Sequence, residues 1–247
     1  MARFRDYAPY NNMLVKIQNP SCGFYATSRD WLGRFNRRLR EDARPMLILA
    51  PMHPVMLVYD LDQTEGDAIP DELAKFGKFS GDFRDEWLSR LISNAERHRI
   101  QIVFNTLSST NGGFATLARV SDGAKMRVVI HDELDEPSRF GILCHELAHI
   151  MLGHLGSDRD RWWPARANLD IKTMEIEAEA VAFVVTQRFG LKGSSAEYVS
   201  RHLDAGEIPA GVSLDLIAKT SGLLERMARE TMPAPKQRPL PKKASAS

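Results

Sequence analysis

The chain has little cysteine, little net charge and no long apolar run. Only Cys22 and Cys144 occur among its 247 residues, too few for the disulfide framework of a small secreted domain. The opening residues, MARFRDYAPY, are charged and polar, unlike the apolar centre of a signal peptide. No stretch approaches the roughly 20 apolar residues that a membrane-spanning helix needs. We therefore expect a cytoplasmic protein without a membrane partner.

Charge is nearly balanced, with 33 Lys and Arg against 32 Asp and Glu, but it is placed unevenly. Six arginines fall between Arg29 and Arg44, which indicates either a functional surface or a solvated helix face. Residues 60–72 are acidic and rich in turn formers, as in a loop. The end of the chain, PAPKQRPLPKKASAS, is rich in Pro and Lys. This composition predicts a disordered basic tail at residues 232–247.

The most informative pattern is HELAHIMLGHLG at residues 145–156, which contains His-Glu-x-x-His. His145 and His149 are four residues apart and share one face of a helix, with Glu146 beside them. The motif also arises by chance. However, the segment 140–152 is apolar around most of its circumference and should be buried. Buried His145, His149 and Glu146 would need partners, and a shared Zn²⁺ satisfies all three, with Glu146 as the catalytic base.

The third protein ligand must come from elsewhere, because Leu152 and Leu155 stand where a metzincin has Gly and His. A second helix is expected at residues 173–189, with Asp170 or Thr173 as N-cap and Gly190 at its end. Its Glu175 and Glu179 share one face, whereas Glu177 points away. Small residues around Glu179 would let it reach the metal.

We therefore expect Glu179 as the third ligand, with Glu175 accepting a hydrogen bond from the far nitrogen of a ligand His, or serving as the alternative ligand. Compensation of the helix dipole would also explain Glu175 and Glu177, but not Glu179.

Further along the chain, Tyr198, Arg201 and His202 are candidate donors to the oxyanion of a hydrolytic reaction. His154 faces away from His149 on a helix, so we assign it to the helix C-terminus, where it would interact with the dipole.

The patterning predicts an α+β protein in two parts. Residues 1–80 are expected to form a small α/β domain, with a linker from about residue 62 to residue 82, and residues 81–231 a metallopeptidase-like domain. There, a small antiparallel or mixed sheet would pack on the motif helix and the glutamate helix, and an edge strand could bind an extended substrate. Other helices are expected at 9–18, from Thr27 or Ser28 to 39, at 85–99, 196–203 and 214–232, and strands at 46–50, 55–61, 100–107, 114–120 and 126–130.

HELAHIMLGHLG followed by EIEAEAVAFVV resembles the ImmA/IrrE family of metallopeptidase-like proteins. The resemblance implies a gluzincin-like zinc site whose third ligand is the Glu of a Glu-Ala-x-x-Phe context, here Glu179 to Phe183. It also implies hydrolysis of a peptide bond in a regulatory protein, such as a repressor, by a metal-bound water. Such an activity can be latent until a partner triggers it.

The front of the chain is similar to the N-terminal domain of ArdC-type antirestriction proteins, in YAPYNNMLVKIQNP, WLGRF and ARPMLILAP. This resemblance implies single-stranded DNA as a second partner and an antirestriction or plasmid-maintenance role, with the metal domain secondary. Cations interleaved with aromatics suit such binding, and the candidate residues are Arg29, Trp31, Arg34, Arg37 and Arg38. The acids in Arg40-Glu41-Asp42-Ala43-Arg44 depart from that family's basic pattern. The alternative is that the aromatics form the core of a small domain.

Overall fold

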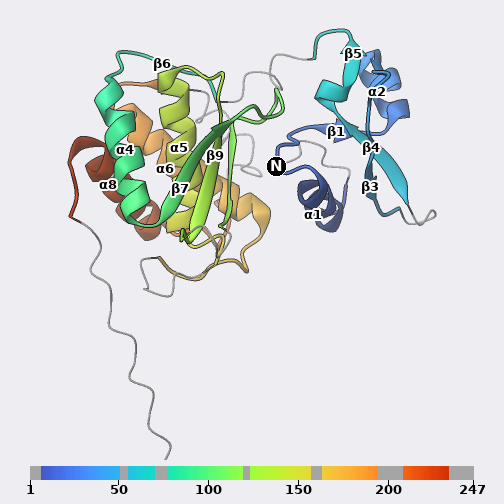
Figure 1. Cartoon of the computed structure of the whole chain (residues 1–247). Coiled ribbons are helices and arrows are strands. Elements are labelled where there is room, and N and C mark those ends of the chain that lie inside the picture. Colours follow the sequence, from blue (N-terminus) through green and yellow to red (C-terminus); the bar gives the residue numbers. More distant parts are fainter. Residues whose placement is uncertain are drawn as a thin grey trace, which may run out of the picture.

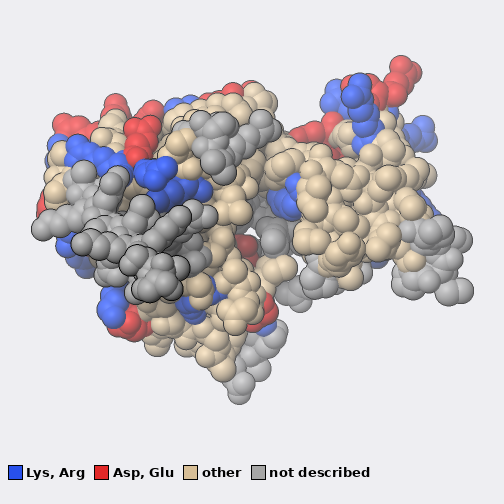
Figure 2. All heavy atoms as spheres, turned by 60° about the horizontal axis from the view of Figure 1, so that its bottom comes forward, with Lys and Arg blue, Asp and Glu red and all other residues tan. Residues whose placement is uncertain are grey.

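The structure is a computed structural model that describes residues 7–50, 55–69, 77–118, 123–156, 163–193 and 208–233. The described chain forms a smaller part before residue 70 and a larger part after residue 76 (Figure 1). On the face shown in Figure 2, Lys and Arg are interspersed with Asp and Glu over the larger part, whereas the smaller part is mostly uncharged, with its charges gathered at the edges. No helix of the described residues is long and apolar enough to cross a membrane.

The smaller part is a short sheet between two helices. Its elements are α1 (Pro9–Gln18), β1 (Tyr25–Ala26), α2 (Ser28–Phe35), β2 (Arg37–Leu39), β3 (Met46–Ile48), β4 (Met56–Asp60), the 3-10 turn η1 (Leu61–Gln63) and β5 (Thr64–Gly66). β1, β4 and β3 pair antiparallel in that order, and β2 pairs with β5. Side chains alternate across the strands, so Val15, Tyr25 and Val58 form one core while Phe24, Trp31 and Leu61 form another.

Helix α1 covers the free edge of β3 with two side-chain amides. Asn11 donates to the carbonyl of Leu49 and accepts from its N–H, at 2.7 and 2.9 Å. Gln18 makes the same pair of hydrogen bonds with Leu47, both at 2.8 Å. These amides satisfy backbone groups that a neighbouring strand would otherwise satisfy. The match fixes α1 along the edge of this sheet.

Two expectations about this part need correction. The second helix ends at Phe35 rather than near residue 39, because Asn36 adopts a left-handed conformation (φ 49°) and residues 37–39 pair with β5 instead. The expected linker at 62–82 is also partly regular: its start forms β5, and Phe79–Ser80 forms β6. Thr27 caps α2 as expected, accepting from the N–H of Asp30 at 3.1 Å.

The larger part has a mixed sheet with helices packed against it, as the α+β expectation requires. Its elements are α4 (Asp85–Arg97), β7 (Ile100–Asn105), β8 (Gly113–Leu117), β9 (Met126–His131), α5 (Glu136–Met151), α6 (Ile171–Arg188), β10 (Lys192–Gly193) and α8 (Leu214–Arg229). The strand order is β7-β9-β8, with β7 parallel and β8 antiparallel to β9. β10 pairs with β6. The expected helix at 196–203 and the basic tail from residue 234 on lie outside the described residues.

Helix α5 is the centre of this part and is buried along most of its length. It packs against β8 and β9 on one side and against α6 on the other, and α8 closes the core against α4 and α6. Asp135 and Asp170 cap α5 and α6 by accepting from the N–H groups of Ser138 and Thr173. The motif therefore lies on a rigid, fully packed helix, which fixes the orientation of its side chains.

Candidate metal centre

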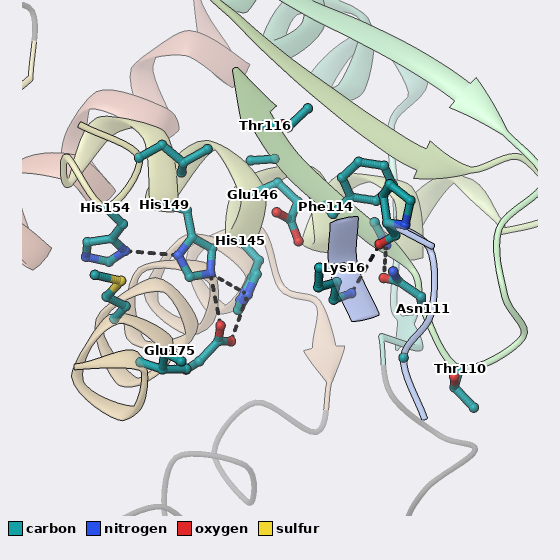
Figure 3. Close-up of a pocket in the computed structure, with 17 residues that line it drawn as sticks. Lys16, Thr110, Asn111, Phe114, Thr116, His145, Glu146, His149, His154 and Glu175 are labelled. Atoms are coloured by element: carbon teal, nitrogen blue, oxygen red, sulfur yellow. Dashed lines mark hydrogen bonds and ion pairs between the residues drawn. The ribbon is translucent and has the colours of Figure 1, made fainter. Parts of the chain in front are cut away.

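Three side chains of α5 and α6 converge at one point (Figure 3). Nε2 of His145 lies 3.2 Å from Nε2 of His149. The carboxylate of Glu175 faces both rings, with its oxygens 3.6 Å from Nε2 of His145 and 3.7 Å from Nε2 of His149. One ligand atom from each residue lies within 4.8 Å of the others. Each of the three therefore directs a ligand atom to a common centre.

The donor set fits a divalent cation. On its other side, the His145 ring has Nδ1 at 2.9 Å from a carboxylate oxygen of Glu179. An ionised carboxylate only accepts hydrogen bonds, so this contact favours a hydrogen on Nδ1 of His145, and its Nε2 can bind a metal once it gives up its own proton. Zn–N distances of about 2.0–2.1 Å in a tetrahedral site separate two ligand nitrogens by about 3.3 Å. The observed separation of the two Nε2 atoms matches this spacing.

The two glutamates occupy each other's expected places. Glu175, expected behind a ligand histidine, lies with the ligand atoms, and Glu179, expected as third ligand, contacts the far nitrogen of His145. The structure thus favours Glu175 as third ligand and Glu179 as the group that orients His145. Helical periodicity puts both acids on one face of α6. Only the packing of α6 on α5 determines which of them lies beside the Nε2 atoms of the two histidines.

Glu146 lies on the cavity side of α5, between His145 and Lys16 in Figure 3. Its side chain is buried, and burial raises the pKa of its carboxyl group. A carboxyl group with a raised pKa is a stronger base once ionised, which suits proton transfer from a nearby water.

The two histidines have different electrostatic surroundings. Burial lowers the pKa of His149 to about 3, so its ring is neutral. Burial also acts against a charged His145, but hydrogen bonds with Glu175 and Glu179 outweigh it and raise the pKa of that ring. A bound cation would take the place of the proton that these carboxylates favour.

A cavity of about 440 Å³ opens in front of these residues. Helices α5 and α6 line one side and β8 lines another, with Gly113, Phe114 and Thr116. Gly113 allows this strand to approach α5 closely, since a Cβ there would lie 2.8 Å from Ile142. The carboxylate of Glu146 therefore lies next to β8, an edge strand of the sheet.

The smaller part of the chain contributes Lys16, Pro20 and Gly23 to the same cavity. The Lys16 ammonium donates to the carbonyl of Pro20 at 3.2 Å, and burial lowers its pKa although the charges of Glu146 and Glu175 act to raise it. The sequence indicates a helix around Lys16 but carries no signal that this helix would face the motif.

Hydrogen bonds across a junction hold the two parts together. Ser108 donates to Asp60 at 3.0 Å, and the backbone N–H of Ser109 donates to Asp62 at 2.8 Å. The amide of Asn111 donates to the carbonyl of Ser21 at 2.9 Å. The connection between β7 and β8 therefore fixes the N-terminal part beside the candidate metal-binding side chains.

A chain of polar residues behind His149 was not expected from the sequence. Nδ1 of His149 lies 2.9 Å from Nδ1 of His154, whose Nε2 lies 2.9 Å from Glu177. Arg166 donates to both oxygens of Glu177, at 2.6 and 2.8 Å. Burial acts to raise the pKa of Glu177, but hydrogen bonds from His154, Arg166 and the Ser213 N–H lower it to about 2. His154, expected to face away from His149 and to interact with the helix dipole, thus contacts that ring within a buried network.

The remaining expected site residues are the oxyanion candidates and the residues proposed for DNA binding. Tyr198, Arg201 and His202 lie outside the described residues. Trp31 is fully buried, packs against Phe24 and Phe35, and donates to the carbonyl of Tyr59 at 3.0 Å.

The arginines proposed for DNA binding differ in their surroundings. Arg37 donates to the side chain and carbonyl of Thr64, at 2.8 and 2.9 Å, which holds β5 in place. Arg29, Arg34 and Arg38 are exposed, and Arg34 lies 3.7 Å from Asp30. Trp31 and Arg37 therefore have structural partners in the smaller part.

Comparison with known proteins agrees with the geometry of the larger part. Residues 95–191 match the family model Peptidase_M78, described as an IrrE N-terminal-like domain. No curated protein matches the chain. Among solved structures, the chain is similar to the Mn(II)-bound crystal structure of the antirestriction protein ArdC from the R388 plasmid, with 14% identity over 90% of this chain and 86% of that chain and a TM-score of 0.28. The matched family segment contains both histidines of the motif, Glu146 and both candidate glutamates. Residues 95–191 of this chain are therefore similar to the IrrE N-terminal-like domains of the Peptidase_M78 family.

Proposed function

We propose that the chain is a zinc-dependent peptidase of the ImmA/IrrE type. The observation that carries this proposal is the convergence of the Nε2 atoms of His145 and His149 with the carboxylate of Glu175, beside the buried Glu146. Two histidines, one carboxylate and an open position are typical of a catalytic zinc site rather than a closed structural one.

His145, His149 and Glu175 would hold the metal, while Glu179 fixes the ring of His145 from behind. When bound, the metal lowers the pKa of water and polarises the carbonyl that is attacked. Glu146 takes a proton from the attacking water as its oxygen forms a bond to the peptide carbonyl carbon. Glu146 then gives this proton to the leaving amine as the C–N bond breaks. The net reaction adds one water across the peptide bond.

An extended peptide can bind along β8. In the order β7-β9-β8 this strand has no partner on its outer side among the described residues, and its residues Gly113 to Thr116 line the cavity. Backbone hydrogen bonds to an edge strand hold a peptide extended and give affinity with little demand on its sequence. Such a peptide would pass directly in front of Glu146.

The substrate we propose is a segment of a regulatory protein. The resemblance to ImmA/IrrE proteins supports this class, and so does the shape of the site. Because Lys16, Pro20 and Gly23 lie over the cavity, the space before the metal-binding residues is enclosed from two parts of the chain. An extended, flexible segment fits such a space better than a folded domain.

The variant Glu146→Gln tests the mechanism. We expect it to keep a full equivalent of zinc but to cleave a mixed-sequence fluorogenic peptide library at least ~10²-fold more slowly than zinc-loaded wild type, since the base is lost while the ligands stay. The measurements are peptide cleavage rates and metal content by mass spectrometry. Unchanged cleavage by the Glu146→Gln protein would contradict the assigned role, and so would a zinc-loaded wild type that cleaves no peptide of the library.

A further inference from the structure

We propose that His154, backed by Glu177 and Arg166, is a positioning residue that holds His149 in the tautomer whose Nε2 is free to bind a metal. The inference deepens the proposed metal site and rests on it. It assigns a role to three polar side chains that a peptidase of this kind does not need for the bond-breaking steps.

Glu177 is the fixed end of the row of contacts that leads to His149. Its side chain is fully buried on α6, and Arg166 donates to both of its oxygens. The backbone N–H of Ser213, the N-cap of α8, donates to it as well, at 2.6 Å. An ionised carboxylate only accepts hydrogen bonds. Because Arg166 supplies the compensating positive charge, Glu177 requires from its last neighbour only an N–H donor.

That neighbour is His154, whose side chain is 1% exposed and whose Nε2 lies 2.9 Å from Glu177. Since Glu177 cannot donate, Nε2 of His154 must carry the hydrogen. A neutral imidazole has one N–H, so Nδ1 of His154 is then an acceptor.

His154 in turn determines which nitrogen of His149 carries the hydrogen. Nδ1 of His149 lies 2.9 Å from Nδ1 of His154. Two bare nitrogens at this distance would repel each other, so Nδ1 of His149 carries the hydrogen. Its Nε2, which faces Nε2 of His145 and the carboxylate of Glu175, is left with a free lone pair. The chain of contacts from Arg166 to His149 thus selects the metal-binding tautomer.

The backbone around His154 is shaped for this contact. Gly153 has φ +83°, and a Cβ there would lie 2.0 Å from the carbonyl oxygen of Pro164. The N–H of His154 donates to the carbonyl of His149 at 3.0 Å, and the N–H of Arg166 donates to that of Gly153 at 2.9 Å. The turn that presents His154 and the segment that presents Arg166 are therefore tied together behind the ligand.

The tautomer can be read directly in the metal-free wild-type chain. Long-range ¹H–¹⁵N correlation spectra at pH 8, with histidines labelled with ¹⁵N, distinguish a protonated from a bare ring nitrogen. We expect His149 to be protonated on Nδ1 and bare on Nε2, and His154 to be protonated on Nε2. A spectrum with the hydrogen of His149 on Nε2 would overturn the proposal, and this readout requires no variant and no metal.

Two variants test the consequence for metal binding. In His154→Asn, the side-chain oxygen lies about where Nδ1 of His154 lies and can accept from His149, whereas His154→Leu offers no acceptor. We expect His154→Leu to weaken zinc binding by about 10–100-fold, measured by competition with a chromophoric chelator, and His154→Asn to recover most of this loss. The matched control His98→Leu removes another buried imidazole, one that does not line the cavity, and should leave zinc affinity unchanged.

The outcomes separate this inference from the proposed function. Equal zinc affinities of wild type and a folded His154→Leu protein would overturn the positioning role while leaving the metal site in place. If wild type itself binds no divalent metal, the proposed function fails, whatever tautomer the spectra show. A drop in affinity in His98→Leu as large as that in His154→Leu would assign the effect to general destabilisation and would also overturn the inference.

Discussion

At the residue scale, the two histidines of the motif differ in the group that contacts the ring nitrogen facing away from the candidate metal centre. His145 has a carboxylate, Glu179, on its outer nitrogen, whereas His149 has a second imidazole, His154. A carboxylate partner attracts the ring proton more strongly than an imidazole does, and it makes the metal-facing nitrogen a stronger electron-pair donor to a metal. This difference agrees with the raised pKa of His145 and the lowered pKa of His149.

The substitution Gly153→Ala tests how far the turn before His154 matters. Alanine at φ +83° costs about 1–3 kcal/mol, and the new methyl group would collide with the backbone of Pro164. We expect a lower free energy of unfolding in urea and, because His154 must shift with its neighbour, weaker zinc binding.

Gly156→Ala is the matched control for this prediction. Gly156 also has a positive φ, +103°, but no atom of the described residues lies within 4 Å of the position that its new methyl group would take. This variant should lose stability without losing zinc affinity. Wild-type affinity in Gly153→Ala, or equal losses in both variants, would contradict the role given to the turn.

The local motif could be predicted from the sequence because its geometry is contained in one helix. His145, Glu146 and His149 lie where the spacing put them. The partners of these residues could not be predicted in the same way. Glu175 and Glu179 share a face of α6, so only the axial offset of two packed helices chooses between them, and His154 meets Glu177 across a separation of 23 residues.

At the scale of elements, the N-terminus of α6 is important because Glu175 lies in its second turn. Asp170 caps this helix, accepting from the N–H of Thr173 at 2.9 Å and from its hydroxyl at 2.6 Å. Both hydrogen bonds lower the pKa of Asp170. Glu175, the proposed third ligand, is thus presented by a helix end that depends on one ionised side chain.

We expect Asp170→Ala to lower the free energy of unfolding by about 1 kcal/mol near neutral pH. Because the pKa of Asp170 is lowered by folding, its contribution is complete above the pKa of the unfolded chain, about 3.9, and is lost as the pH falls through the folded-state pKa. The difference between wild type and Asp170→Ala, measured by urea unfolding, should therefore shrink below about pH 4.

Asp170→Asn provides the control, since Asn caps helices about as well without a charge. Its stability should stay close to that of wild type at neutral pH and show no such loss in acid. A difference between wild type and the Ala variant that is constant from pH 7 to pH 3 would contradict the assignment of this pH dependence to Asp170.

The long elements of the structure could be predicted, whereas most of the short strands could not. Helices such as α1 and α4 and strands such as β9 follow from periodic apolar residues, and α1 also from Pro9 at its first position. β1, β2, β5, β6 and β10 are two or three residues long and exist only through pairing with distant segments. For such strands the decisive information is long-range, which is why residues 37–39 were expected to be helical and 64–66 to be linker.

At the scale of the whole molecule, the cavity before the metal-binding side chains belongs to both parts of the chain. Lys16 reaches it from α1, and the junction through Asp60, Ser108 and Asn111 fixes that helix in position. No local sequence pattern indicates this arrangement, because it depends on how two separately folded cores meet.

The structure of the smaller part also bears on the alternative function, single-stranded DNA binding. This hypothesis requires a cationic surface together with aromatic rings that are exposed for stacking on bases. In the structure Trp31 lies in a core with Phe24 and Phe35, and Arg37 is used to hold β5. The face shown in Figure 2 carries no continuous cationic surface on the described residues of the smaller part. These placements leave Trp31 unavailable for stacking on bases.

The most direct test of the candidate metal centre is the metal content and zinc affinity of purified wild type beside Glu175→Gln and Glu179→Gln, measured by mass spectrometry and by competition with a chromophoric chelator. We expect wild type to bind one zinc, Glu175→Gln to lose it, and Glu179→Gln to keep it with about 10–100-fold weaker affinity. Loss of zinc in Glu179→Gln together with wild-type affinity in Glu175→Gln would contradict the account.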